Sequence, residues 1–427
     1  MVALHLVPRF PTNHQLDHPA LRRLFANARD LFAIADYRRM WAIGAFCGVA
    51  RWLEFVAIAI FAYELTQSPE LVALLAVLRM LPYVLLGFGM GALADALDRK
   101  PLLIASLLVM ALVAGAMALL TLSGAVGYAL VAAATMASGA FWTTDMPVRR
   151  RLLVDAVGQD HIAAALGFDN STMYAARALG PLIGGTTYQL LGIEGIFALI
   201  AASYLVCLLL AARLTPDSCA APATRATGTR FGLWLPPRDL LVDRRFQVIM
   251  GVTLVYNLWC FPFVSMVPVI AQRDFGLAPI FVGAMSACDG LGGMFGALIV
   301  ASLAVERTLF RYYYLGTLWF LLLVLGLSLH LTVGTAVAAL LLLGLASASF
   351  SATQYALIYV IAPPDMRGRA TGVLSFFIGS SMFGHFHTGL LFERLGSVTA
   401  MRLMAIEGMT VMLVLGILWW RNNDKPA

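Results

Sequence analysis

Residues 91–103 read GALADALDRKPLL, and this stretch decides the fold because it joins two long apolar segments through one short charged turn. The apolar segments cover residues 71–94 and 101–123. Each is long enough to cross a hydrocarbon layer of ~30 Å as a helix, which takes about 20 residues. The charged residues of the turn are Asp95, Asp98, Arg99 and Lys100. Two membrane-crossing helices joined so closely predict a helical protein with several spans.

The composition of the 427-residue chain supports this class of protein. Hydrophobic residues make up 61% of the chain and charged residues only 12%, whereas soluble domains carry about 25% charged residues. No basic stretch contains interleaved aromatic residues, so the net charge of +6 is better explained by membrane topology than by a nucleic acid partner. The five cysteines form no CxxC pair and no Walker A motif occurs. We therefore expect no metal, no cofactor and no direct use of ATP.

The apolar runs predict an all-α membrane protein with twelve transmembrane helices. Their expected ranges are 41–63, 71–94, 101–123, 125–144, 163–191, 195–212, 246–270, 279–303, 312–331, 333–360, 370–391 and 398–420. Residues 213–245 are rich in Pro, Ala, Thr and Arg and have no spanning pattern. They are expected to link a six-helix half at 41–212 to a second six-helix half at 246–420.

The distribution of basic residues predicts which way the chain crosses the membrane. With the two tails, residues 1–40 and 421–427, in the cytoplasm, 23 of the 29 Lys and Arg residues lie on the cytoplasmic side. Cytoplasmic loops carry an excess of basic residues, so both termini are expected there, in a multi-pass protein of a bacterial inner membrane. Apolar residues recur at helical spacing within 21–37, which indicates either a helix along the membrane surface or an approach to the first span.

The charged turn resembles the signature loop of the major facilitator superfamily of transporters. The matching residues are Gly91, Leu93, Ala94, Asp95, Arg99 and Lys100. Residues 180–185 resemble the Gly-Pro-x-x-Gly-Gly motif of its antiporters, through Gly180 and Pro181, and residues 363–369 resemble its Pro-x-x-x-Arg-Gly-Arg stretch. The resemblance covers about residues 41–420 and implies two parallel six-helix halves with a substrate site between them near the midplane.

The same resemblance implies a gate at the cytoplasmic ends of the second and eleventh spans. Asp95 would hold these ends together through the start of the eleventh span and nearby arginines. The residues assigned to this gate are Gly91, Asp95, Arg99, Lys100, Gly180, Pro181, Arg367 and Arg369. Residues 48–75 look like the branch that holds enterobactin exporters and macrolide-efflux proteins, although Arg51 stands where that branch usually has Asp.

The two predicted halves also resemble each other when the first is shifted by 204 residues. Gly180 then meets Gly384, and Gly185 meets Gly389. The dipeptide Leu-Gly at 191–192 meets the same dipeptide at 395–396. Such coincidences favour two halves with the same topology.

Ionisable residues inside spans are the candidates for coupling and substrate binding, because each costs several kcal/mol near the bilayer centre. Arg51 and Glu54 are three residues apart and could pair, with Glu54 as a protonation site or as half of a structural ion pair. Asp289 lies in the middle of the eighth span and needs either a partner from another helix or a proton.

The fifth span carries Asp169 and Asn170, with Arg177 on about the same helix face as Asp169. These residues could bind an anionic or zwitterionic substrate or form an interhelix pair. Asn257 and Gln354 would suit a mixed apolar and polar pocket, with helix packing as the alternative. His385 could serve in a proton relay or simply at a helix contact.

Together these features predict a secondary active transporter, not an enzyme, that works by alternating access. The expected activity is proton-coupled export of a small amphiphilic molecule, such as a drug or siderophore, by a monomer in the lipid bilayer. An importer or a lipid flippase on the same fold is the alternative, and a receptor or enzyme without transport is a remote one.

Overall fold

The computed structural model describes residues 28–96, 98–157, 161–215, 242–304, 306–363 and 366–423, and these residues are almost entirely helical. The first half contains α2 (Ala35–Thr66), α3 (Pro69–Ala96), α4 (Arg99–Leu122), α5 (Tyr128–Asp155) and α6 (Ile162–Ala212). The second half begins with α8 (Arg244–Val255), the π-helical turn η4 (Tyr256–Cys260), α9 (Phe261–Arg273) and α10 (Pro279–Leu303). It continues with η5 (Glu306–Thr308), α11 (Leu309–Leu329), α12 (Val333–Ile361), α13 (Arg367–Gly379) and α14 (Ser381–Asn423).

Two glycines divide the longest helices into separate spans. Gly192 inside α6 has φ 66° and ψ −168°, and Gly396 inside α14 has φ 74° and ψ 167°. These angles lie outside the helical region, and essentially glycine alone adopts them. With α6 and α14 divided there, with α8, η4 and α9 forming one span, and with α13 running into α14, the described residues form the twelve predicted spans.

The prediction of an all-α, twelve-span bundle of two six-helix halves is therefore confirmed. Several helices extend beyond the predicted apolar runs. For example, α5 continues to Asp155, where the prediction ended at residue 144, because the arginine- and leucine-rich segment that follows favours helix. The Leu-Gly pairs that aligned in the sequence mark the same reversal of the chain in both halves.

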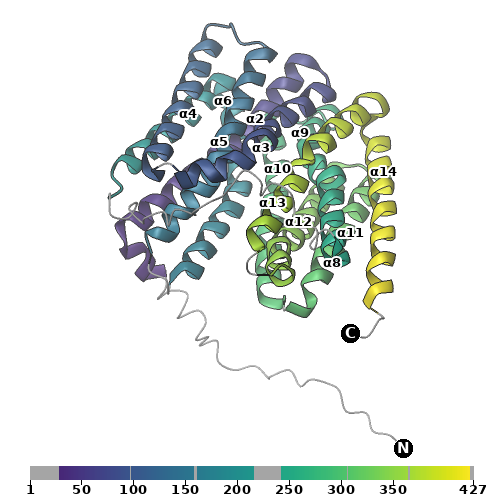
Figure 1. The fold of residues 1–427 in the computed structure, drawn as a ribbon. Coiled ribbons are helices and arrows are strands. Elements are labelled where there is room, and N and C mark those ends of the chain that lie inside the picture. The colour runs from purple at the N-terminus through teal and green to yellow at the C-terminus, as the bar shows by residue number, and fades with distance from the viewer. Residues whose placement is uncertain are drawn as a thin grey trace, which may run out of the picture.

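Close glycine contacts hold the two halves together and repeat between them. A Cβ atom at Gly185 of α6 would lie 2.3 Å from the Pro279 carbonyl oxygen of α10. A Cβ atom at Gly389 of α14 would lie 2.4 Å from Cβ of Ala73 in α3. Glycine thus permits the fifth span to touch the eighth, and the eleventh to touch the second. Figure 1 shows the purple and blue helices of the first half beside the green and yellow helices of the second.

We call the end of the bundle that contains residues 67–68, 192, 274–278 and 396 the outer end, and the opposite end the inner end, after the predicted topology. At the outer end, the Ser68 hydroxyl donates to the Glu393 carboxylate at 2.8 Å, and the Glu70 amide donates to the same oxygen at 3.2 Å. Gln272 of α9 donates to Glu64 of α2 at 3.5 Å. These contacts close the outer end between the halves.

Candidate functional site

A group of buried charges lies inside the first half, and its pairing differs from the predicted one. Arg51 does not pair with Glu54. Instead, Nη2 of Arg51 lies 3.4 Å from Oδ2 of Asp145 in α5. Glu54 accepts a hydrogen bond of 2.8 Å from the Ser138 hydroxyl, and its other oxygen lies 3.6 Å from Nη2 of Arg79 in α3. Residues three apart on a helix point in directions about 60° apart, so each of them meets a different neighbouring helix.

The indole of Trp142 connects these two ion pairs. The guanidinium carbon of Arg51 lies 4.4 Å from the Trp142 ring centroid, and that of Arg79 lies 4.9 Å from it. Both distances are within the range of cation–π attraction, which strengthens when the cation is removed from water. Trp142 therefore stabilises two positive charges in the bundle interior.

The charges continue toward the inner end through Asp169 of α6. Arg149, which is 1% exposed, contacts Asp169 at 2.5 Å and Asp145 at 3.7 Å. Arg150 contacts the second Asp169 oxygen at 3.3 Å and donates to Asn170 at 2.7 Å. Asp169 thus pairs with arginines of α5. It does not pair with Arg177, although both residues lie on about the same face of α6.

Arg177 instead pairs with Asp289 of α10, so the partner expected from another helix is present. Nε of Arg177 donates to Oδ2 of Asp289 at 2.7 Å, and Asp289 is 2% exposed. The guanidinium carbon also lies 5.0 Å from the Trp52 ring centroid. Nearby, the hydroxyl groups of Tyr174 and Ser351 are 2.9 Å apart. Both the ion pair and the hydroxyl contact join the first half to the second.

The polar residues predicted in the second half lie in its buried core. Asn257, in the π-helical turn η4, donates to the Thr253 carbonyl at 2.8 Å. Gln354 donates to the Thr253 hydroxyl at 3.4 Å. Nδ1 of His385 lies 3.1 Å from the Ser265 hydroxyl. Gln354 thus joins α12 to α8, whereas the hydrogen bond of Asn257 stays within its own span.

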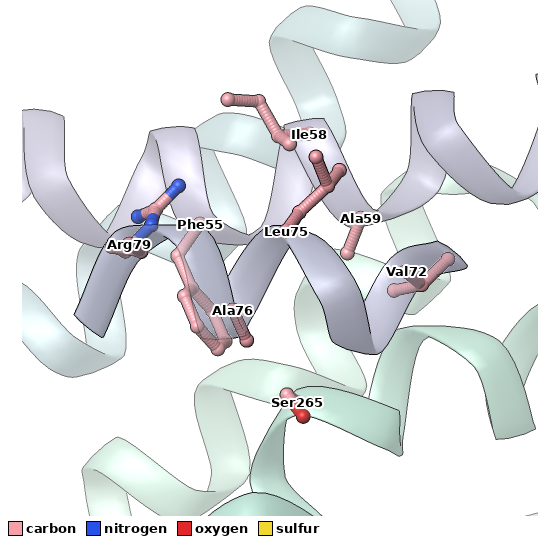
Figure 2. Close-up of a pocket in the computed structure, with 8 residues that line it drawn as sticks. All are labelled: Phe55, Ile58, Ala59, Val72, Leu75, Ala76, Arg79 and Ser265. Atoms are coloured by element: carbon pink, nitrogen blue, oxygen red, sulfur yellow. The ribbon is translucent and has the colours of Figure 1, made fainter. Parts of the chain in front are cut away.

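One small cavity lies between the halves, among α2, α3 and α9 (Figure 2). Its lining residues are Phe55, Ile58, Ala59, Val72, Leu75, Ala76, Arg79 and Ser265. It is large enough for about one water molecule. The first half contributes its apolar wall and Arg79, and the second half contributes Ser265, which also contacts His385.

Contacts are described for five of the eight residues assigned to the gate. Arg99 donates to Asp155 at 2.6 Å and Lys100 donates to the Leu214 carbonyl at 2.5 Å, so both tie together helices of the first half. Gly180 packs on Trp52 and Leu53, Pro181 contacts Gly283 through its carbonyl, and Arg367 lies over the Tyr359 ring. The side chains at Gly91, Asp95 and Arg369 lie outside the described residues, so their gate role stays a prediction.

The sequence suggested a pair between Asp145 and Arg149, which the structure contains at 3.7 Å, but Arg79, Asp145 and Arg149 were not among the predicted site residues. Arg79 lies in the middle of an apolar run, and an intramembrane arginine is by itself a sign of function. Glu407 of α14, which is not among the predicted site residues, accepts a hydrogen bond from Trp259 at 2.7 Å and lies 2.9 Å from His387. Among the described residues, no group of three or more His, Cys, Asp or Glu side chains could hold a metal ion.

The sequence resembles a known protein family and two bacterial transporters. The sequence model described as Major Facilitator Superfamily matches residues 40–384. The chain is 21% identical over 291 residues to the Staphyloferrin A transporter of Staphylococcus aureus (strain NCTC 8325 / PS 47), a match that covers 66% of this chain and 71% of the relative. It is 23% identical over 383 residues to the uncharacterized MFS-type transporter YfiS of Bacillus subtilis (strain 168), covering 87% and 89%.

Solved structures share the fold. A bacterial homologue of the human lysosomal transporter Spinster, inward-facing and occupied, superimposes with a TM-score of 0.72 at 13% identity, over 92% of this chain and 98% of that one. The nucleoside transporter NupG gives a TM-score of 0.69 at 12% identity, over 90% and 99%. At these identities the likeness concerns the fold alone.

Proposed function

Since this chain belongs to the Major Facilitator Superfamily, we propose that it is a proton-coupled exporter of a small amphiphilic molecule, such as a drug or siderophore. The family makes the chain a multi-pass membrane transporter and not an enzyme. The coupling ion, the direction and the cargo are the parts that we propose. The likeness to a protein named as a staphyloferrin A transporter supports a siderophore-type cargo.

The observation that carries the proposal is the buried Arg177–Asp289 pair. It joins α6 to α10 near the middle of both spans, where the two halves must move relative to each other during alternating access. A proton on Asp289 would remove the negative charge that holds Arg177. Proton occupancy would then change the relative stability of the cavity states, which is the requirement for coupling a gradient to transport.

Exposed polar residues lie between this pair and the inner end. Asn170 and Ser171 of α6, and Ser351 and Tyr355 of α12, are exposed polar residues in the inner parts of their spans, while contacts between the halves close the outer end. A molecule arriving from the inner side would meet these groups first. With the predicted topology that side is the cytoplasm, from which an exporter takes its cargo.

The test is flux through proteoliposomes that hold an inside-acid gradient. Addition of siderophores, macrolides and cationic dyes should collapse the gradient for at least one class of compound with the wild type, and not with Asp289→Asn or Arg177→Gln. Arg394→Gln, which removes an exposed charge of α14, is the matched control and should behave as the wild type does.

Two outcomes would contradict the proposal. Equal proton release by Asp289→Asn and the wild type would remove Asp289 from coupling. Accumulation of cargo with protons, or movement of lipids between leaflets in the absence of any response to the panel, would favour the importer or the flippase.

A further inference from the structure

The cavity between α2, α3 and α9 contains a buried positive charge whose hydrogen bonds are incomplete. Arg79 is 2% exposed and lines the cavity, as Figure 2 shows. Nη1 of Arg79 is buried without a hydrogen-bond partner. A buried N–H group of a charged side chain that lacks a partner is costly, so such an atom beside a cavity indicates a place for a ligand.

The carboxylate nearest to Arg79 does not satisfy it. Oε1 of Glu54 lies 3.6 Å from Nη2 of Arg79, whereas charge-assisted hydrogen bonds are about 2.7–2.9 Å long. The other Glu54 oxygen accepts from Ser138 at 2.8 Å. The rings of Phe55 and Trp142, 5.4 Å and 4.9 Å from the guanidinium carbon, supply attraction but no hydrogen-bond acceptor of carboxylate strength.

The other carboxylates of the first half do not supply a second acceptor for Arg79. Arg79 forms an ion pair with Glu54, and this pair is separate from the chain of ion pairs that contains Asp145 and Asp169. Arg149 and Arg150 share Asp169, and Asp145 is shared by Arg51 and Arg149. Both of these aspartates are therefore already paired with other arginines.

The remaining cavity wall is apolar apart from a single hydroxyl. Phe55, Ile58 and Leu75 lie on the side of the first half, and Ser265 reaches the cavity from α9 of the second. We propose that Arg79 and this cavity form the subsite that binds the anionic group of an amphiphilic substrate, with the apolar wall against the substrate's hydrocarbon part. This inference rests on the proposed function and names its substrate class as an amphiphilic carboxylate or similar anion.

The charge of such a substrate agrees with outward movement. An inside-negative membrane potential drives a net negative charge out of the cell. In the present conformation the cavity holds no more than about one water molecule, and the Glu64–Gln272 and Ser68–Glu393 contacts lie on its outer side. The subsite must therefore enlarge before a substrate larger than water can enter it.

The experiment measures equilibrium binding to the full-length protein in lipid nanodiscs, without any proton gradient. The probes are 4-phenylbutyrate, its neutral amide and the corresponding amine, which share one apolar body and differ in charge. The wild type should bind the carboxylate at least about tenfold more tightly than the other two. Arg79→Gln should abolish this preference, and Arg79→Lys should retain part of it.

A second variant keeps the test valid if Arg79→Gln fails to fold. Ala76→Val adds bulk to the cavity wall while every charge stays, and should weaken carboxylate binding severalfold. Ala129→Val adds the same methyl groups at an exposed position of α5 and should bind the probe as the wild type does. Ser265→Ala should weaken binding less than Arg79→Gln, because it removes a neutral group.

Binding of the carboxylate by folded Arg79→Gln with wild-type affinity would overturn the inference, as would tightest binding of the amine by the wild type. The wild type could also be stabilised by sodium chloride relative to sodium gluconate, without any effect of phenylbutyrate. That result would assign the site to a free halide and overturn its role in substrate binding. Arg79-dependent binding without proton-linked flux would uphold the subsite while contradicting the proposed function. Proton-linked flux of cationic dyes without carboxylate binding would uphold the proposed function and overturn the subsite.

Discussion

Arg177 and Asp289 are 112 residues apart in sequence, and their side chains meet at 2.7 Å where the two halves of the bundle touch. The backbone allows this contact, because a Cβ atom at Gly290, next to Asp289, would lie 2.4 Å from the Ala178 nitrogen. Small residues therefore bring the helices close enough for a direct ion pair. The pair is therefore a direct ionic connection between the halves.

Removal of one member of this pair is expected to destabilise the protein strongly. Asp289→Ala leaves Arg177 as a buried charge without its partner, which costs about 3–5 kcal/mol. The double variant Arg177→Gln/Asp289→Asn should recover much of this loss, because it buries no charge. Thermal unfolding in one detergent measures both changes. If the effects of Arg177→Gln and Asp289→Asn simply add up in the double variant, the pair contributes no coupling energy.

The contact between the fifth and eighth spans should tolerate no added methyl group. Gly283→Ala would place Cβ 2.4 Å from the Pro181 carbonyl oxygen, so the helices must separate at a cost of about 1–3 kcal/mol. Transport should fall with stability. Gly326→Ala is the control, since nothing lies within 4 Å of its Cβ position, and it should be neutral or slightly stabilising. Equal melting temperatures for the two variants would contradict the predicted clash.

The Glu393 contacts are expected to favour the conformation that is closed at the outer end. Glu393→Ala removes the acceptor for the Ser68 hydroxyl and the Glu70 amide, a loss of about 1 kcal/mol at this exposed position. The open population should rise about fivefold. Spin labels at Leu65 and Leu395 would report it as a longer distance component. Arg394→Ala serves as the control, and an unchanged distance distribution for Glu393→Ala would refute the role of this contact.

Trp142 should matter more for stability than an ordinary buried aromatic residue. Trp142→Leu removes the ring that faces both Arg51 and Arg79, with an expected loss of about 3–5 kcal/mol from packing and cation–π attraction. Trp142→Phe should restore part of it. Trp319→Leu, at a half-exposed position, should cost much less. Chemical or thermal unfolding compares the three, and similar losses at both tryptophans would argue against a special role for Trp142.

Asp95 is predicted to act at the inner gate. Asp95→Ala should reduce cycling at least about tenfold while membrane insertion and yield stay normal, because the predicted gate contact is needed in only part of the cycle. Flux per inserted molecule measures the effect. Normal flux by the variant would remove the gate assignment.

The sequence contained enough information for the fold but not for the pairing of charges. Span number follows from local hydropathy, and the glycines at 192 and 396 act through their own backbone angles. The partner of Arg51, by contrast, is Asp145, which lies 94 residues away on another helix. Helical spacing says which residues share a face, but not which neighbouring helix that face meets. That depends on rotation and packing of the whole bundle, which no local pattern contains.

The connections at the outer end have a further consequence. They consist of residues 67–68, 123–127, 274–278 and 330–332 and of the single glycines Gly192 and Gly396. Segments of this length cannot fold over an opening, so these connections form no lid over the outer end. Discrimination between cargoes must then occur among the helices themselves. If the outer end faces the outside of the cell, as the predicted topology has it, antibodies and proteases will find little exposed loop to bind there. Reagents that lock the protein from that side will need to bind between the helices.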